Sequence, residues 1–226
     1  VTCELALNAG KSLAYYLGNE GTVVIGYDTR TTNEMLDQAI CAGLLESGVD
    51  VVKIGMVPTP LVGYATEKLD ADAGIMLTAS HNPSPYNGIK LWNKNGMAYT
   101  SAQEAKIEEI YANKDYISVS WDNVGKLSVN EEIKGQYIDD LVDMVDIKEG
   151  LKVVIDCASG AGSEISPLVF RKAGCEVTTL NSQPDGFFPG RNPEPNAENL
   201  QTLMKTVVAI GADLGIAHDG DADRMI

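Results

Sequence analysis

Arginine is scarce in this chain of 226 residues, which contains only Arg30, Arg171, Arg191 and Arg224. Lysine and arginine together number 17, against 32 aspartates and glutamates, so the net charge is −15. Proteins hold nucleic acids and anionic membrane surfaces through patches of lysine and arginine. The composition therefore argues against both kinds of partner. In an acidic protein, rare arginines placed in loops instead suit a small anion such as a phosphate.

Histidine and cysteine are also rare. The two histidines are His81 and His218, and the four cysteines are Cys3, Cys41, Cys157 and Cys175. No two cysteines have C-x-x-C spacing, and all four lie in apolar stretches typical of helices or strands. We therefore expect buried thiols in a reducing cytoplasm, not disulfides or a metal–thiolate centre. No apolar run approaches the length of a membrane-spanning helix.

Motifs of several common enzyme classes are missing. Ser80 lacks the G-x-S-x-G sequence of hydrolases, and a Ser-His-Asp triad would need one of only two histidines. The segment 160–162, Gly-Ala-Gly, follows an apolar strand but does not match G-x-G-x-x-G, and no Walker motif is present. A serine hydrolase is thus unsupported, and the short glycine segment is more typical of a strand-to-helix turn.

The hydrophobic pattern that is present alternates between helix and strand. Helices are predicted at 4–17, 33–47, 59–69, 101–112 and 132–145, and strands at 23–26, 51–54, 74–77, 89–92 and 153–156. With 44% hydrophobic residues, this is the composition of a folded protein. Strands that alternate with helices of this length predict an α/β fold with a largely parallel sheet.

The second half of the chain repeats the plan of the first. The glycine that ends a helix at Gly48 has a counterpart at Gly174, and A-D-A-G-I around Gly74 is echoed by A-D-L-G-I around Gly215. We infer two similar α/β/α domains, 1–128 and 129–226, each with a mostly parallel, mixed sheet flanked by helices. Ligands bind outside the carboxyl ends of such strands. The loops that follow the two matching strands are therefore expected to face each other across a cleft.

One of these two loops contains three alternating aspartates, Asp219, Asp221 and Asp223. Carboxylates at this spacing can converge on one point, and hard oxygen ligands suit Mg²⁺ or Ca²⁺. An EF-hand would need glycine where Arg224 stands, so that site is not indicated. A solvated acidic turn is the alternative, but the apolar strand before the loop favours a metal site.

The other loop contains Ser80 beside His81. A serine close to a metal loop and to cations could carry a phosphoryl group and pass it on, although a turn serine bonded to its own backbone is the simpler alternative. Arg30 and Lys90 lie at or near strand ends of the same domain. Lys90 could act as a general acid or base or hold phosphate, or it could be an ordinary edge-strand lysine.

Five segments in order resemble the α-D-phosphohexomutase superfamily, which comprises phosphoglucomutases, phosphomannomutases and phosphoglucosamine mutases. The segments are GYDTR at 26–30, TASHNP at 78–83, NGIK at 87–90, NPEPN at 192–196 and DGDADR at 219–224. The resemblance implies a Mg²⁺-dependent enzyme that interconverts hexose 1-phosphates and hexose 6-phosphates through a phosphoserine and a hexose 1,6-bisphosphate intermediate.

The resemblance also assigns roles to residues of this chain. Ser80 is expected to be the phosphoserine, and its phosphate is expected to bind one Mg²⁺ together with Asp219, Asp221 and Asp223. The expected surroundings of the transferring group are Arg30, His81, Lys90 and Arg224. Arg30 and Arg224 would bind phosphate, and either His81 or Lys90 would carry the proton.

Members of the superfamily have four domains, and this chain resembles the first two. The loops that select the sugar and bind its distal phosphate belong to the other two domains. We therefore expect a fragment with little or no turnover alone, and neither the hexose nor the oligomeric state can be read from it. A non-catalytic module that binds a divalent metal or a sugar phosphate, and a plain structural scaffold, are the alternatives.

Overall fold

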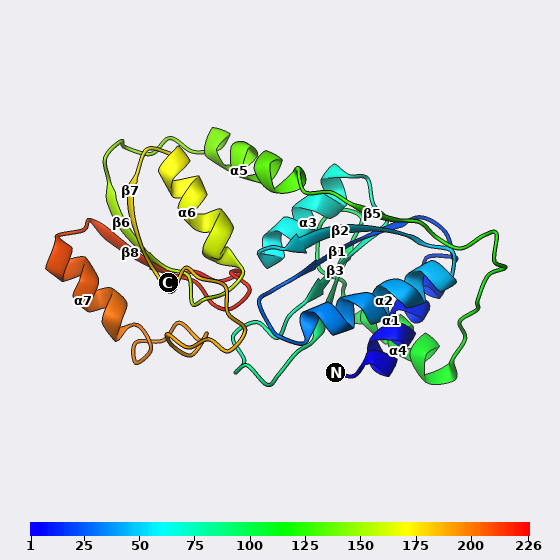
Figure 1. The fold of residues 1–226 in the computed structure, drawn as a ribbon. Coiled ribbons are helices and arrows are strands. Elements are labelled where there is room, and N and C mark those ends of the chain that lie inside the picture. Colours follow the sequence, from blue (N-terminus) through cyan, green and yellow to red (C-terminus); the bar gives the residue numbers. More distant parts are fainter.

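Two α/β/α domains lie side by side in the computed structural model, which describes residues 1–226 (Figure 1). The first domain contains a five-stranded sheet in the order β4-β3-β1-β2-β5. Its strands are β1 (Thr22–Tyr27), β2 (Asp50–Met56), β3 (Ala73–Leu77), β4 (Ile89–Asn93) and β5 (Leu127–Val129). Only β4 runs antiparallel to its neighbour, so the sheet is mixed and mostly parallel, as the sequence predicts.

Helices cover both faces of this sheet. Three of them share one face, α1 (Cys3–Tyr16), α2 (Asn33–Glu46) and α4 (Ser101–Asn113), and α3 (Thr59–Lys68) lies on the other (Figure 1). On the first face, Leu13, Leu36 and Ile107 pack against the strand residue Ile75. All five residues of β3 are buried. A strand covered on both faces must be apolar along its whole length, which is why 73–77 reads as a continuous hydrophobic run.

The second domain is smaller and repeats this arrangement. Its strands β6 (Lys152–Asp156), β7 (Glu176–Leu180) and β8 (Leu214–Ala217) form a parallel sheet in the order β7-β6-β8. The helices are α5 (Ile133–Asp143), α6 (Gly162–Lys172) and α7 (Gln201–Ile210). Successive residues of β6 enter different clusters, because Val153 lies in the cluster that includes Phe170 of α6 and Val154 lies in the cluster that includes Leu203 of α7.

The register of the two sheets confirms the predicted internal repeat. Val24 of β1 pairs with Gly74, and Val154 of β6 pairs with Gly215. Both glycines are pressed against a helix, Gly74 against α3 and Gly215 against α7, so neither position has room for a side chain. The matching glycines after α2 and α6 have φ values of +91° and +93°, a conformation that favours glycine. The three strands of the second sheet therefore repeat the order and direction of β2, β1 and β3 in the first.

The connection between the domains contains one element that the sequence pattern does not indicate. Strand β5 pairs with β2 and so belongs to the first sheet. All three of its side chains are exposed, which removes the hydrophobic alternation by which a strand is recognised. The predicted division between residues 128 and 129 falls inside this strand, and it stays a prediction.

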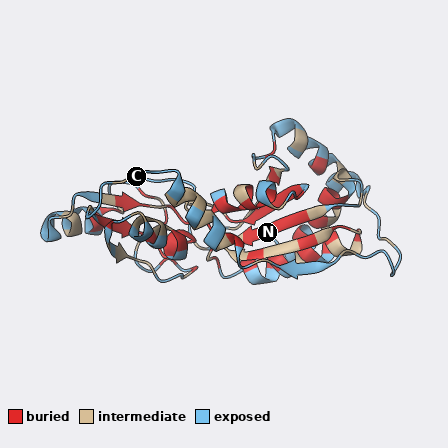
Figure 2. Cartoon of the chain, turned by 90° about the horizontal axis from the view of Figure 1, so that it is seen from above, coloured by how far each residue is buried: buried red, intermediate tan, exposed pale blue.

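An apolar junction joins the domains behind the strand ends. Ile133 of α5 and Ile165 of α6 are buried in the same cluster as Leu61 of α3. Beside it, the Tyr64 hydroxyl donates a 2.7 Å hydrogen bond to Asp140. Buried residues are concentrated in the strands of both domains and in the helices that face them (Figure 2). The chain has no helix with the length and hydrophobicity needed to cross a bilayer.

The four cysteines are free thiols of unequal exposure. Cys3 is exposed and Cys41, Cys157 and Cys175 are buried. Burial raises the pKa of both Cys41 and Cys157 to about 12, and only the thiolate is a nucleophile. We expect a chromogenic disulfide reagent at neutral pH to titrate one thiol quickly in the native chain and the rest only after unfolding. Cys3→Ser should remove the fast phase, and two or more fast thiols would contradict the packing described.

Candidate active site

The loops after β3 and β8 meet between the two domains, as the internal repeat predicts. The hydroxyl of Ser80 donates a 3.0 Å hydrogen bond to the Asp219 carboxylate. The Lys90 ammonium donates hydrogen bonds of 2.8 Å to Asp221 and 2.9 Å to Asp223. The tertiary structure thus brings together groups that lie about 130 residues apart in the sequence.

Ser80 is held in a left-handed backbone conformation, with φ of +53°. For a residue other than glycine this conformation costs roughly 1–2 kcal/mol, and it persists only where neighbours impose it. Here the Thr78 hydroxyl donates a 2.7 Å hydrogen bond to the buried carboxylate of Asp28 and accepts one of 2.8 Å from the Ser80 amide. Strain of this kind is concentrated at functional sites.

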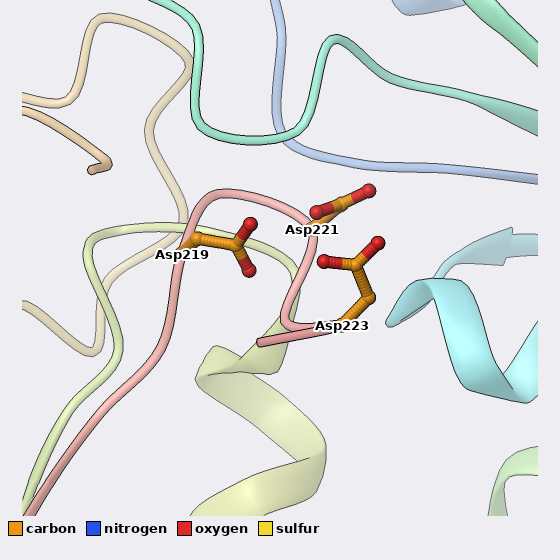
Figure 3. Close-up of side chains that lie close together, drawn as sticks. All are labelled: Asp219, Asp221 and Asp223. Carbon is orange, nitrogen blue, oxygen red and sulfur yellow. The ribbon is translucent and has the colours of Figure 1, made fainter. Parts of the chain in front are cut away.

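The three aspartates converge on one side of the second loop. One oxygen from each lies within 4.8 Å of the others, and Figure 3 shows the Asp219 carboxylate turned toward Asp221 and Asp223. Asp219 and Asp221 are fully buried. Burial, together with the charges of the other two aspartates, raises the pKa of Asp219 to about 6. Carboxylates crowded in this way are stabilised by a cation between them.

The first turn of α3 faces Asp221. The Thr59 hydroxyl donates a 2.7 Å hydrogen bond to one Asp221 carboxylate oxygen, Oδ2, and the Thr59 amide donates one of 2.9 Å to the Asp221 carbonyl. A helix N-terminus also favours negative charge. The other carboxylate oxygen of Asp221, Oδ1, is buried and has no hydrogen-bond partner. An unpaired buried oxygen is costly, so this atom and the carboxylate oxygens of Asp219 and Asp223 fit a divalent cation.

Two cations flank the aspartates. Burial opposes the charge on Lys90, but Asp221 and Asp223 outweigh it and raise the pKa of Lys90 above its ordinary value. Burial alone would raise the pKa of Asp221, but chiefly Lys90 and also Thr59 lower it below its usual value. Arg224 reaches back along its own loop, and its Nε lies 3.0 Å from an Asp219 oxygen.

His81 lies beside Ser80 and also contacts the second domain. Its Nδ1 is 3.4 Å from the Ser80 hydroxyl, and its Nε2 is 3.4 Å from the Glu194 carboxylate. Its adjacency to Ser80 in the sequence did not suggest this arrangement. The left-handed backbone of Ser80 contributes to the loop conformation that places the His81 ring beside the Ser80 hydroxyl.

Comparison with known proteins identifies the fold and its relationships. The model of phosphoglucomutase/phosphomannomutase α/β/α domain I matches residues 1–118, and that of domain II matches residues 135–226. The chain belongs to the phosphoglucomutase/phosphomannomutase family. It resembles the first two domains of this family, which confirms the superfamily expected from the five motifs.

Relatives of the chain come from archaea and bacteria. Proteins named "Probable phosphoglucosamine mutase" from Methanobrevibacter smithii and Methanothermobacter thermautotrophicus are 90% and 58% identical over 226 residues. The crystal structure of a phosphoglucomutase/phosphomannomutase family protein from Burkholderia thailandensis is 28% identical, with a TM-score of 0.88 over 100% of this chain and 50% of that one. The chain covers 51% and 50% of the two archaeal relatives, so it spans about half their length.

Arg30 is buried against the serine loop. It is 2% exposed, and its Nε donates a 3.1 Å hydrogen bond to Asp28. Its four remaining N–H groups point at main-chain carbonyls of the serine loop, those of Ser80, Asn82, Pro83 and Tyr86, at 2.7–2.9 Å. All five guanidinium donors are therefore used. We revise the expected phosphate-binding and catalytic role of Arg30 accordingly: Arg30 positions the serine loop.

Arg191 clamps the loop of the three aspartates in the second domain, as Arg30 clamps the serine loop in the first. Its side chain is 5% exposed, and its Nε lies 2.9 Å from the Asp156 carboxylate, an ion pair without the alignment of a hydrogen bond. Another of its nitrogens donates a 2.7 Å hydrogen bond to the carbonyl of His218, just before the aspartates. Each domain thus uses an aspartate at or just after its central strand and a buried arginine to hold its functional loop.

The sequence motifs did not predict several of the residues that contact the candidate site. Thr59 has a signal that could have found it, because it follows β2 and the carboxyl ends of parallel strands form one edge of the sheet. Glu194 lies inside the NPEPN segment, but nothing in that segment shows that its side chain reaches His81. Asp28 and Thr78 lie opposite each other because β1 and β3 are paired up to Tyr27 and Leu77.

Proposed function

We propose that this chain supplies the phosphoserine loop and the metal-binding loop of a phosphohexomutase that interconverts hexose 1-phosphates and hexose 6-phosphates. The observation that carries the proposal is the position of Ser80, whose hydroxyl from one domain lies 3.0 Å from the carboxylate of Asp219 in the other. The names of the relatives support glucosamine phosphate as the substrate class of the whole protein.

Asp219, Asp221, Asp223 and a phosphate on Ser80 are proposed to hold one Mg²⁺. Their oxygens suit a hard cation, and the unpaired Oδ1 of Asp221 is a ligand atom that is already buried from solvent. When bound, the ion would neutralise charge on the transferring phosphoryl group.

Ser80 exchanges a phosphoryl group with a hexose 1,6-bisphosphate in the proposed reaction. The Ser80 oxygen forms a bond to phosphorus while the bond from phosphorus to the sugar oxygen breaks. The proton that leaves Ser80 passes to His81 and then to the freed sugar oxygen, which leaves a hexose monophosphate and a phosphoserine. Lys90 remains an ammonium, and we assign it with Arg224 to binding the phosphoryl oxygens. The reverse transfer to the other sugar oxygen completes the interconversion.

The test is phosphorylation of the purified chain. After incubation with glucosamine 1,6-bisphosphate or glucose 1,6-bisphosphate and Mg²⁺, intact mass spectrometry should find one added phosphoryl group, and fragmentation should place it on Ser80. Sustained turnover of hexose monophosphate is expected to be low, because the chain spans half of its relatives. Phosphate on a different residue, or none on a chain extended to the length of the relatives, would contradict the proposal.

Metal binding gives an independent prediction. At 100 times the dissociation constant, Mg²⁺ should stabilise the native chain by about 2.7 kcal/mol, measured as a higher melting temperature in MgCl₂ than in matched ionic strength. Asp221→Asn should remove most of this gain, because it removes a ligand charge while keeping the size of the side chain. The exposed Asp115 gives the control, since Asp115→Asn should preserve the gain. Equal stabilisation of both variants would favour the plain scaffold.

A further inference from the structure

Glu194 lies between the histidine of the serine loop in the first domain and the arginine of the metal loop in the second. One carboxylate oxygen lies 3.4 Å from Nε2 of His81, and the other lies 3.6 Å from a guanidinium nitrogen of Arg224. Each partner is in turn directed at the centre of the site, His81 toward the Ser80 hydroxyl and Arg224 toward Asp219.

The backbone around Glu194 is held more firmly than that of an ordinary surface loop. Pro193 and Pro195 flank it, and both are buried. The Glu194 amide donates a 3.2 Å hydrogen bond to the side chain of Asn192, and the Glu194 carbonyl accepts one of 2.7 Å from Asn199. Because proline also fixes φ, the carboxylate is presented from a constrained backbone.

Glu194 forms an ion-pair contact with Nε2 of His81 that lacks the alignment of a hydrogen bond. A carboxylate can only accept, so its charge favours the tautomer with hydrogen on the facing Nε2. In a neutral imidazole the other nitrogen, Nδ1, is then an acceptor, and Nδ1 is the atom 3.4 Å from the Ser80 oxygen. The Ser80 hydroxyl donates its hydrogen to Asp219 in this structure, so it must turn before that proton can pass to Nδ1. A separation of this size is common before substrate binds and tightens in the reacting complex.

The alternative proton acceptor is less well placed. The Lys90 ammonium donates hydrogen bonds to two carboxylates, so it has no free electron pair to receive a proton. His81 has an unprotonated nitrogen on the side of Ser80 and a carboxylate on the opposite side, an arrangement that steadies the imidazolium formed when the proton arrives.

We propose that Glu194 is a positioning residue that holds His81 as the Nε2–H tautomer, with Nδ1 directed at Ser80, and that links this histidine to Arg224. The inference rests on the proposed function, because it names the residue through which His81 serves phosphoryl transfer. It follows that Glu194 acts on the rate of transfer through His81 and contributes no ligand to the metal.

The tautomer can be observed directly. With ¹⁵N-labelled histidine, NMR at a pH above the range in which imidazoles titrate should show His81 protonated on Nε2 in the native chain. His218→Gln assigns the two sets of signals. Glu194→Ala should give a mixture of tautomers, whereas Glu194→Gln should retain the native one, since an amide oxygen still accepts. Glu198→Ala is the matched control, an exposed glutamate four residues away. An Nδ1–H tautomer in the native chain, or unchanged populations in Glu194→Ala, would overturn the proposal.

The rate of phosphoryl transfer gives the functional readout. Glu194→Ala should slow phosphorylation of Ser80 by about tenfold, with the Mg²⁺-induced rise in melting temperature unchanged and with partial recovery in Glu194→Gln. A rate equal to that of Glu198→Ala would contradict the inference. If the native chain acquires no phosphate, the rates are compared on a chain extended to the length of its relatives. No phosphate there contradicts the proposed function, while the NMR measurement still decides the role of Glu194.

Discussion

Replacement of Ser80 by alanine is expected to abolish phosphorylation of the chain by a hexose 1,6-bisphosphate. The Ser80 hydroxyl is the nucleophile in the proposed transfer, and Ser80 is the only serine or threonine hydrogen-bonded to Asp219. Losing it removes one hydrogen bond from Asp219 but none of the three carboxylates, so the unphosphorylated variant should still be stabilised by Mg²⁺. Intact mass and the melting temperature in MgCl₂ measure the two effects separately.

The same loop offers a matched control for this substitution. Ser84 lies four residues further along, half-buried, and its hydroxyl makes no hydrogen bond within the chain. Ser84→Ala should accept one phosphoryl group as the native chain does. If Ser80→Ala still acquires phosphate with native kinetics, the nucleophile is another residue and the enzyme proposal loses its central atom. A native chain that binds Mg²⁺ but is never phosphorylated, even at the length of its relatives, would favour the binding module.

Replacement of Arg30 by methionine is expected to have the largest effect on stability. Breaking a buried ion pair by removing one partner costs about 3–5 kcal/mol, because the remaining charge stays buried. Here Arg30→Met leaves the Asp28 carboxylate without its cation and removes the donors that satisfy four carbonyls of the serine loop. Urea denaturation, followed by far-ultraviolet circular dichroism, gives the free energy of unfolding.

Two further variants separate charge from geometry at Arg30. Arg30→Lys keeps the charge but offers at most three donors in place of five, so an intermediate loss is expected. Arg171→Met removes an exposed arginine and should change the free energy of unfolding by about 0.5 kcal/mol or less. A loss in Arg30→Met no greater than that of the Arg171 variant would show that the serine loop is held by other contacts. Any Arg30 variant that folds should be phosphorylated more slowly, since its loop is less ordered.

Strand and helix identity were available from the sequence because burial on both faces imposes a pattern. The central strands are continuous apolar runs, and the helices around them show apolar positions at helical spacing. Where burial is absent the pattern disappears, which is why β5 was missed. The internal repeat was also readable, since Gly74 and Gly215 are both pressed against a helix and Gly48 and Gly174 both need positive φ.

The residues of the candidate site were likewise proposed from the sequence, but the contacts between their side chains were not. Alternating aspartates and the serine loop are local patterns, and the topology of parallel sheets places both at strand ends. Which atom faces which depends on how the domains dock and on loop conformations such as the left-handed backbone of Ser80. That packing turned Arg30 inward and brought Glu194 to His81.

The sequence by itself thus determined the two-domain α/β/α fold, the family, and the two loops on which the proposed chemistry depends. The tertiary structure alone decided the roles within them: Arg30 as a clamp, Lys90 as an ammonium between carboxylates, and His81 between a serine and a glutamate. The physical reason is that residue type and spacing constrain local conformation and burial. Contacts between groups that lie 50 to 139 residues apart in the sequence depend on distances that only the packed fold sets.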